Sequence, residues 1–299
     1  MVIQSLGDIE NKAISRKTRR IAIAAAEDKN VLLAVKEASE KKIVEPLFVG
    51  DQKKIKSLCE KIGFNTGNFQ IINQENPVES AIIAVKSIRE GQASILMKGL
   101  VPTAPLLRAI LDKENGIKKR NVLSHLALFE LKTYHKILGI TDAAMNISPD
   151  ISEKQDIIRN SIDIFHGLGY QKPKIAVLGP LETVNPKIPS TSDAALLTMM
   201  GTRGQIKDCL IDGPLALDNA ISVEAARHKN IISEVAGDAD ILLAPDLNSG
   251  NILYKSLVFL AGAVTAAIIT GAKVPVVLTS RADSDKTKLM SIALAAALE

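Results

Sequence analysis

The sequence predicts an α/β protein built on a mostly parallel sheet. Short apolar runs alternate along the chain with longer segments of helical period, an order typical of parallel α/β sheets. Many of these runs are continuous, as expected of strands that helices cover on both faces. Apolar residues make up 46% and charged residues 23% of the 299 residues, so the chain can bury a large core.

Strands are predicted where the short apolar runs lie. These runs cover 20–25, 45–50, 69–73, 93–99, 135–141, 174–179, 208–212, 240–245 and 274–280. The segments 121–131 and 134–146 follow each other with only a short polar break, which favours a hairpin or a crossing between sheets.

Helices are predicted between the strands. They lie near 29–42, 51–63, 77–90, 104–115, 151–166 and 284–298. In the fourth of these, Thr103 can accept a hydrogen bond from an amide of the first turn. We expect a tight turn over 246–251 that leads into one buried helix over 252–270. The uncharged stretch between Lys255 and Lys273 is shorter than the roughly 20 residues that a membrane-spanning helix needs.

The length of the chain allows one or two domains, because domains usually hold about 100–200 residues. We expect two, with a boundary near residue 130 at the hairpin-like segment. The first domain is predicted to cover 1–130 plus 272–299, and the second 131–271. No Ser- or Gly-rich linker marks the boundary, so we expect the domains to share a tight cleft.

Charge and composition exclude several classes of function. The 37 Lys and Arg against 33 Asp and Glu give a net charge of +4 that is spread along the chain, and the sequence has no Trp. This favours small anionic ligands over nucleic acid. Cys59 and Cys209 are too few for a disulfide framework, and Asp8 and Glu10 interrupt any apolar export signal. We therefore expect a reduced, cytoplasmic protein.

Common catalytic motifs are missing from the sequence. It contains no G-x-G-x-x-G, no G-x-x-x-x-G-K-[ST] and no G-x-S-x-G, which argues against a standard dinucleotide turn, a P-loop and a serine hydrolase. The four histidines have no metal-binding spacing. Both cysteines are interpreted as structural residues.

A first polar cluster follows the predicted strand 93–99. Lys98 and Arg108 can flank an anion there, Gly99 permits close approach of the backbone, and the helix that starts near Thr103 offers free N–H groups. An ordinary strand-to-helix turn with surface cations is the alternative.

A second polar cluster follows the predicted strand 274–280. Ser280 and Arg281 supply a hydroxyl and a guanidinium suited to phosphate oxygens, and Asp283 and Asp285 are carboxylates that can accept a proton. The alternative for Ser284 and Asp285 is that they only cap the last helix.

A third group of acidic and amide side chains falls at strand ends or on the turns that follow. It comprises Asp142, Asn146, Asp193, Asp212, Asp218, Asn219, Asp246 and Asn251, and it extends to Lys255. Ligands bind at the carboxyl ends of strands in open α/β sheets, although capping and turn formation also explain such residues.

Several long motifs in this order resemble the phosphate acetyltransferase and phosphate butyryltransferase family. They are MKGLVPTAPLLRAIL (97–111), ITDAAMNISPD (140–150), DGPLALDNAIS (212–222), APDLNSGNILYKSLVFLAGA (244–263) and TSRADS (279–284). The butyryl branch is the better match, through DGPLALDNA and SRADS, and because V-L-T-S-R stands where the acetyl branch has N-D-L-S-R.

The resemblance implies two α/β/α lobes with the active site in the cleft between them, an architecture similar to that of isocitrate and isopropylmalate dehydrogenases. It also implies the reversible conversion of acyl-CoA and phosphate into acyl phosphate and CoA, without a metal, a bound cofactor or a covalent enzyme intermediate. A homodimer or larger homo-oligomer is implied, with no nucleic acid or membrane as partner.

The resemblance also assigns residues. The Ser-Arg pair of the family corresponds to Ser280 and Arg281, and its Leu-Arg pair to Leu107 and Arg108. Thr287 stands where the acetyl branch has an aspartate implicated as the base for the CoA thiol, so Asp283 or Asp285 would have to replace it. The candidate phosphate- and CoA-binding residues are Lys98, Gly99, Thr103, Arg108, Asp142, Asn251 and Lys255.

Three alternatives remain open on the sequence alone. The first is a phosphate acetyltransferase that uses acetyl-CoA. The second is a metal- and NAD-dependent decarboxylating dehydrogenase of the same architecture, whose metal Asp212, Asp218 and Asp246 would hold. The third is a protein that binds anions without catalysis.

Overall fold

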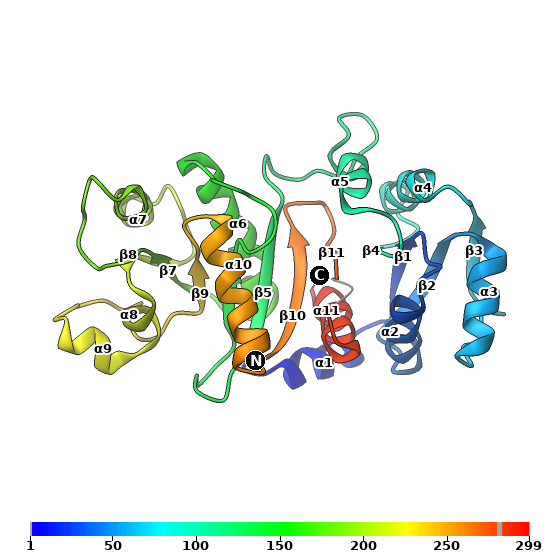
Figure 1. Cartoon of the computed structure of the whole chain (residues 1–299), viewed down its shortest axis with the longest axis horizontal. Coiled ribbons are helices and arrows are strands. Elements are labelled where there is room, and N and C mark those ends of the chain that lie inside the picture. The colour runs from blue at the N-terminus through cyan, green and yellow to red at the C-terminus, as the bar shows by residue number, and fades with distance from the viewer. Residues whose placement is uncertain (1, 280–282, 299) are drawn as a thin grey trace. The chain divides into compact units, whose positions relative to one another are not determined.

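The computed structural model describes residues 2–279 and 283–298, and Figure 1 shows its elements. The chain divides into two compact units. Unit 1 consists of the residues up to Leu6 together with Asn121–Thr265, and unit 2 consists of Gly7–Arg120 together with the chain from Ala266 onward. Both units are built from parallel strands and helices, which confirms the predicted α/β class. The predicted domain limits at residues 130 and 272 stay a prediction.

Unit 2 contains a sheet with the strand order β3-β2-β1-β4-β11-β10. Its strands are β1 (Arg19–Ala24), β2 (Val44–Gly50), β3 (Gln70–Asn73), β4 (Ile95–Lys98), β10 (Val264–Thr270) and β11 (Val276–Val277). All neighbouring pairs from β3 to β11 are parallel, and β10 runs antiparallel to β11.

Helices cover both faces of this sheet. They are α1 (Leu6–Ser15), α2 (Lys29–Glu40), α3 (Gln52–Lys61), α4 (Pro77–Arg89), α5 (Thr103–Leu111) and α11 (Asp285–Ala297). In Figure 1, α4 and α5 lie above the strands of unit 2, and α2 and α11 lie below them. Side-chain caps begin several of these helices: Asp28, for example, accepts hydrogen bonds from the N–H groups of Asn30 and Val31.

Unit 1 contains strands in the order β5-β6-β9-β7-β8. They are β5 (Ser124–Glu130), β6 (Leu138–Thr141), β7 (Lys174–Leu178), β8 (Leu210–Leu215) and β9 (Ile241–Leu243). The helices are α6 (Ile151–Gly167), α7 (Pro189–Thr202), α8 (Leu217–Ile221), α9 (Val223–His228) and α10 (Leu247–Lys255), followed by a π-helical turn, η1 (Ser256–Leu260). β5 and β6 form an antiparallel pair, which confirms the expected hairpin, and the other pairs are parallel.

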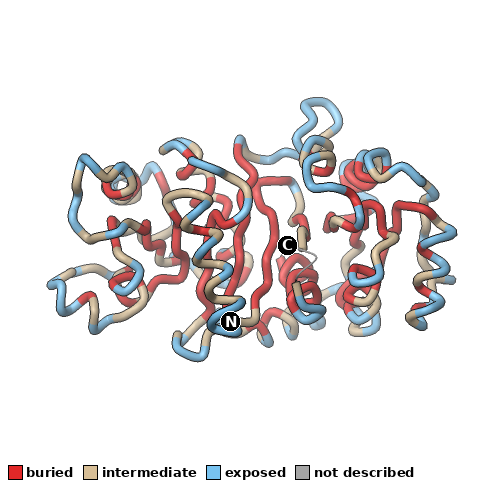
Figure 2. The backbone as a smooth tube through the Cα atoms, viewed as in Figure 1, coloured by how far each residue is buried: buried red, intermediate tan, exposed pale blue. Residues whose placement is uncertain are grey.

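The strands form the core of each unit, and Figure 2 shows them largely buried. Residues 21–26, which belong to β1 and its carboxyl end, are fully buried, as are Leu126–Phe129 on β5 and Ile241–Leu243 on β9. These continuous buried runs agree with the prediction of strands covered on both faces. None of the described helices is long and apolar enough to cross a membrane.

The predicted helix over 252–270 is wrong. Asp246 is the N-cap of α10, so the helix already includes residues 247–251, which were expected to form a turn. The helical segment ends at Leu260, and residues 264–270 form strand β10. The β-branched residues Val264, Thr265 and Ile268 favour a strand there, although the lack of charge made the stretch look like a buried helix.

Smaller differences concern the ends of elements. α5 ends at Leu111, before the turn that leads to Gly116. Its N-cap is Pro102 with no side-chain hydrogen bond, so Thr103 is the first helical residue and not the cap that we expected. The predicted strand 274–280 is reduced to Val276–Val277, and residue 280 lies outside the described residues.

An ion-pair cluster joins the amino ends of the strands in unit 1. Asp238 lies 2.6 Å from Lys174 Nζ and 2.9 Å from Lys136 Nζ, and Lys136 also contacts Asp240 at 2.6 Å. Burial of Asp238 would by itself raise its pKa, but hydrogen bonds from Lys174 and Lys136 hold the pKa well below its ordinary value. The charged carboxylate therefore stabilises the fold.

Asp238→Asn should lower the free energy of unfolding at pH 7 by about 1–2 kcal/mol, because the carboxylate is partly exposed and solvent screens it. A carboxyl whose pKa is lowered by folding contributes stability above about pH 4, and this contribution is lost as the pH falls through the folded pKa. The difference between wild type and variant should therefore shrink on acidification. Urea unfolding at pH 7 and pH 3 measures it, and an equal difference at both would contradict this account.

Candidate functional site

The carboxyl ends of β1 and β4 form the switch point of the sheet in unit 2. β1 leads by α2 to β2 on one side, whereas β3 is followed by α4 and by β4 on the other side of β1. In an open α/β sheet the crevice between two such strands is where ligands bind. The residues that follow β1 and β4 are therefore the first place to look for a site in this unit.

Gly99 lies directly against the end of β1 at this switch point. Its N–H donates to the Ala24 carbonyl at 2.8 Å, and Leu100 N–H donates to the Ala25 carbonyl at 2.6 Å. A Cβ at position 99 would lie 2.1 Å from the Ala25 oxygen, so only glycine fits. Lys98 Nζ donates to the Gly99 carbonyl at 3.1 Å. Gly99 therefore approaches the backbone of β1 closely, while its predicted approach to an anion stays a prediction.

Arg108 lies further along α5 and is exposed. It lines a pocket of about 290 Å³ between α4 and α5, together with apolar side chains such as Val78, Ile82 and Pro105. Lys98 is not among the residues that line this pocket. The pairing of Lys98 and Arg108 around one anion therefore stays a prediction.

The second predicted cluster is described only in part, because Ser280 and Arg281 lie outside the described residues. Ser284 is the N-cap of α11 and accepts a hydrogen bond from Thr287 N–H at 3.1 Å, as the capping alternative predicted. Asp285 is the first, exposed residue of α11. The backbone carbonyl of Asp283 accepts a hydrogen bond from the buried Lys288.

The third predicted group comes together in part at the carboxyl edge of unit 1. Asp142, at the end of β6, is buried and accepts hydrogen bonds from the N–H groups of Ala144 and Met145 at 2.8 and 3.0 Å. Asn146 donates to the other Asp142 oxygen at 2.5 Å. Asn251, on α10, donates to the Ala143 carbonyl at 3.0 Å. Asp142 thus organises the loop after β6.

A buried lysine that sequence reasoning missed lies at the same edge. The Lys154 side chain, in the first turn of α6, is 6% exposed, and its Nζ lies 2.6 Å from Asp193 Oδ2 on α7. The pKa of Asp246 is lowered mainly because its carboxylate accepts a hydrogen bond from the Ser249 N–H, and the charge of Lys154 adds to this lowering. Burial of Asp246 acts in the opposite direction and raises its pKa. The sequence does hint at its burial, because residues three apart share one side of a helix and Lys154 lies three residues from both Ile151 and Ile157 on the inward side of α6.

The remaining polar candidates show no catalytic arrangement. Lys255 is exposed at the last position of α10. Burial raises the pKa of the Cys59 thiol to about 11 and that of Cys209 to about 12, so neither is a ready nucleophile. Within residues 2–279 and 283–298, no group of three or more acidic, histidine or cysteine residues could hold a metal ion.

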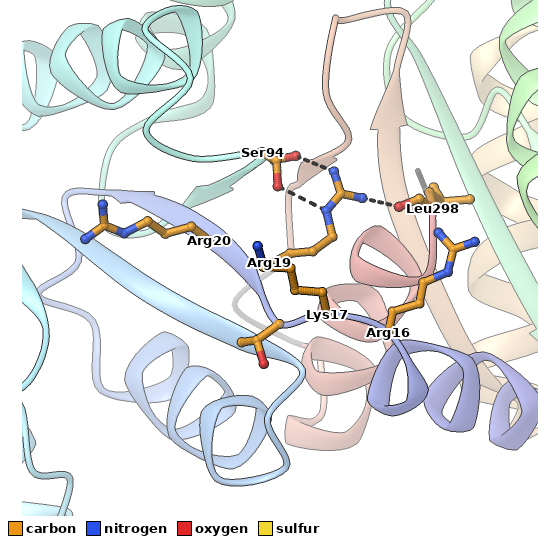
Figure 3. A pocket seen from close by; sticks show the side chains of 7 residues that line it. Arg16, Lys17, Arg19, Arg20, Ser94 and Leu298 are labelled. Atoms are coloured by element: carbon orange, nitrogen blue, oxygen red, sulfur yellow. Dashed lines mark hydrogen bonds between the residues drawn. The ribbon is translucent and has the colours of Figure 1, made fainter.

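A cation-lined pocket lies at the opposite, amino edge of the strands in unit 2. It has a volume of about 540 Å³ and is lined by Arg16, Lys17, Arg19, Arg20 and Ser94 among others. Figure 3 shows the Arg19 guanidinium between Ser94, whose Oγ lies 3.0 Å from Nε, and the carbonyl of Leu298, while Arg20 points away. Arg19 thus joins β1, the residue before β4 and the end of the α11 segment.

Comparison with known proteins places the chain in a family. The family model described as "Phosphate acetyl/butaryl transferase" matches residues 6–81 and 74–296. A phosphate butyryltransferase from Clostridium acetobutylicum is 45% identical over 295 residues, which cover 99% of this chain and 98% of that protein. The chain belongs to the phosphate acetyl/butyryl transferase family. The resemblance inferred from the motifs is therefore confirmed, and the chain is an acyltransferase.

Two further proteins are similar to this chain over nearly its whole length. A phosphate acetyltransferase from Thermotoga maritima is 44% identical over 280 residues, covering 94% of this chain and 95% of that protein. The crystal structure of a branched-chain phosphotransacylase from Enterococcus faecalis V583 matches with a TM-score of 0.82 and 35% identity, over 93% of this chain and 98% of that one. The likeness to isocitrate and isopropylmalate dehydrogenases stays a prediction, as do the individual site residues.

Proposed function

We propose that this phosphate acyltransferase converts acyl-CoA and inorganic phosphate into acyl phosphate and CoA, reversibly, and prefers butyryl or branched acyl groups to acetyl. The observation that carries the proposal is full-length similarity to a phosphate butyryltransferase. The butyryl-type motifs DGPLALDNA and SRADS, and the fold shared with a branched-chain phosphotransacylase, also support the preference.

In the proposed mechanism, the CoA sulfur attacks the carbonyl carbon of the acyl phosphate and inorganic phosphate leaves. The thiol, with a pKa of roughly 8.5, is mostly protonated at neutral pH and must lose its proton on attack. Asp283 or Asp285 is proposed to accept this proton. Arg281 and Arg108 hold the phosphate oxygens and Ser280 donates a hydrogen bond, so that electrostatic stabilisation and positioning supply most of the catalysis.

The switch point of unit 2 is proposed to bind part of the phosphate or CoA. Gly99 lets the loop after β4 lie against β1, and α5 begins at Thr103 without a side-chain cap. Lys98 adds a positive charge at this end of β4. In unit 1, Asp142, Asn251 and Lys255 are the proposed contacts.

The acyl preference is tested by phosphate-dependent release of CoA from acetyl-, butyryl- and isobutyryl-CoA. One extra or missing methylene is worth about 1–3 kcal/mol of discrimination, so kcat/KM for butyryl-CoA should exceed that for acetyl-CoA by about 10-fold or more. The reverse order would establish the acetyl alternative.

CoA is proposed to act as a substrate, with no resident cofactor. The reaction should therefore proceed unchanged in a metal chelator and without a nicotinamide. A requirement for Mg²⁺ and NAD would instead support the dehydrogenase alternative, for which Asp212, Asp218 and Asp246 were considered. Tight CoA binding without turnover would support the anion-binding alternative.

We also propose that the protein is a cytoplasmic homo-oligomer, with neither nucleic acid nor membrane as partner. The segment α10–η1 supports the oligomeric state, because large apolar side chains are exposed along it: Ile252 is 66%, Phe259 67% and Leu260 86% exposed. Contiguous apolar patches of this kind commonly mark protein–protein contacts.

The double substitution Phe259→Glu and Leu260→Glu should reduce the mass measured by analytical ultracentrifugation, because charged side chains would have to be buried at the contact. The exposed apolar residue Val184, in the loop between β7 and α7, offers a control, since Val184→Glu should leave the mass unchanged. An oligomer that survives the double substitution, or a monomeric wild type, would contradict the proposal.

A further inference from the structure

Lys154 and Asp193 form an ion pair at the carboxyl edge of unit 1 that the proposed mechanism does not use. α6 follows β6 and α7 follows β7, so the first turns of both helices lie at this edge. Lys154 belongs to the first turn of α6, and Asp193 to the beginning of α7. β7 lies beside β9, and the chain leaves these two strands in opposite directions, so this edge is also the switch point of unit 1.

The two partners of the pair differ in accessibility. The Lys154 side chain is 6% exposed, and its ammonium lies 2.6 Å from Asp193 Oδ2. The Asp193 side chain is 26% exposed, and among the described residues no donor reaches its second oxygen, Oδ1. The buried Lys154 ammonium thus holds Oδ2 of the Asp193 carboxylate in place, and Oδ1 remains available to a ligand.

A purely structural role explains this arrangement poorly. Withdrawing the Lys154 ammonium from water is costly, and an apolar side chain of similar size usually stabilises a protein at least as well as a buried charge with its partner. The buried ammonium therefore holds a carboxylate at an edge where α/β sheets bind ligands. The charge of Lys154 also adds a smaller contribution to the lowered pKa of Asp246 at the start of α10.

We infer that Asp193 accepts a hydrogen bond from a neutral donor of CoA and that Lys154 is its positioning residue. The inference rests on the proposed function. A carboxylate repels phosphate and acyl phosphate, which are anions, but accepts hydrogen bonds from neutral donors. CoA offers such donors in the amide N–H groups and hydroxyl of its pantetheine arm and in the amino group of its adenine, whereas an acyl phosphate dianion offers none. CoA is therefore the substrate that matches Asp193 Oδ1.

The test compares the affinities for the two substrates of the reverse reaction in Asp193→Asn. KM for CoA should rise about 10-fold or more, since hydrogen bonds to charged groups contribute about that much. KM for butyryl phosphate should change less than about 2-fold. Calorimetric titration with CoA gives the same ratio from dissociation constants, without turnover. Asp156→Asn is the matched control, because it removes the Asp156–Arg159 ion pair from α6, the helix that carries Lys154, and should change neither constant.

A second variant guards against misfolding, because Asp193→Asn leaves the Lys154 ammonium buried without its carboxylate. The double variant Lys154→Met, Asp193→Met replaces the pair with apolar side chains and should fold. It should lose CoA affinity as the single variant does. Lys154→Met alone should weaken CoA binding, yet add nothing when Asp193 is already replaced, because Lys154 acts through Asp193.

The outcomes separate this inference from the proposed function. A folded double variant with wild-type affinity for CoA overturns the inference, as does an equal rise in KM for both substrates. A wild-type chain that binds CoA but forms no acyl phosphate overturns the proposed function, and the calorimetric comparison of the variants then still decides the role of Asp193.

Discussion

Arg281→Ala is expected to lower kcat by about 100- to 1000-fold, the usual effect of removing one donor that stabilises charge in the transition state. As phosphate leaves, negative charge builds up on its oxygens, and a guanidinium binds two of them with parallel hydrogen bonds. A steady-state assay of acyl phosphate formation measures the loss. Ser280→Ala should cost far less, because a neutral hydroxyl contributes a single weaker hydrogen bond.

Two controls accompany this experiment. Arg281→Lys keeps the charge but loses the paired donors, so it should recover only part of the rate. Lys273→Ala removes another exposed cation of unit 2 and should leave kcat unchanged. Small and equal losses in Arg281→Ala and Ser280→Ala would remove Arg281 from the site.

Gly99→Ala is expected to have the second large effect, on both stability and activity. The added Cβ would lie 2.1 Å from the Ala25 oxygen and 2.7 Å from the Ala24 oxygen, and both are backbone atoms that cannot rotate away. The loop after β4 would have to move from β1, at a cost of about 1–3 kcal/mol in the free energy of unfolding. The start of α5 would move with this loop. The value of kcat/KM should therefore fall by more than the loss of folded protein accounts for.

Gly67→Ala is the matched control for this substitution. Gly67 lies in an exposed loop of the same unit, and its added Cβ would meet only the end of the Asn65 side chain, at 3.2 Å. Thermal unfolding and steady-state kinetics of both variants show whether the effects of Gly99→Ala come from the clash with β1. If Gly99→Ala unfolds and turns over like Gly67→Ala, the loop after β4 does not position the site.

The sequence predicts most of the fold because buried parallel strands leave a strong pattern. The runs that became β1, β2, β6 and β7 were found within a few residues of their ends. The pattern fails where an apolar stretch contains two kinds of structure, as at 252–270, where a helix, a π-helical turn and β10 follow one another without a charged residue after Lys255. Periodicity cannot separate a buried helix from a buried strand there.

The site is less predictable than the fold. Gly99 and Asp142 could be found because each follows a strand, and both have backbone-level contacts there: Gly99 with the end of β1, and Asp142 with the N–H groups of the next turn. Their binding roles stay predictions. Lys154 was missed because its role depends on Asp193, which lies 39 residues further along the chain and meets it only through the packing of α6 on α7. Contacts between distant segments leave no local signal in one sequence.

The most direct test of the proposed reaction is the release of free CoA thiol from butyryl-CoA, with and without inorganic phosphate, in the presence of a metal chelator. Thiol should appear only when phosphate is present, in an amount equal to the acyl phosphate trapped with hydroxylamine, and at an unchanged rate in the chelator. Release that does not depend on phosphate, or no release from butyryl-, isobutyryl- and acetyl-CoA alike, would contradict the assignment.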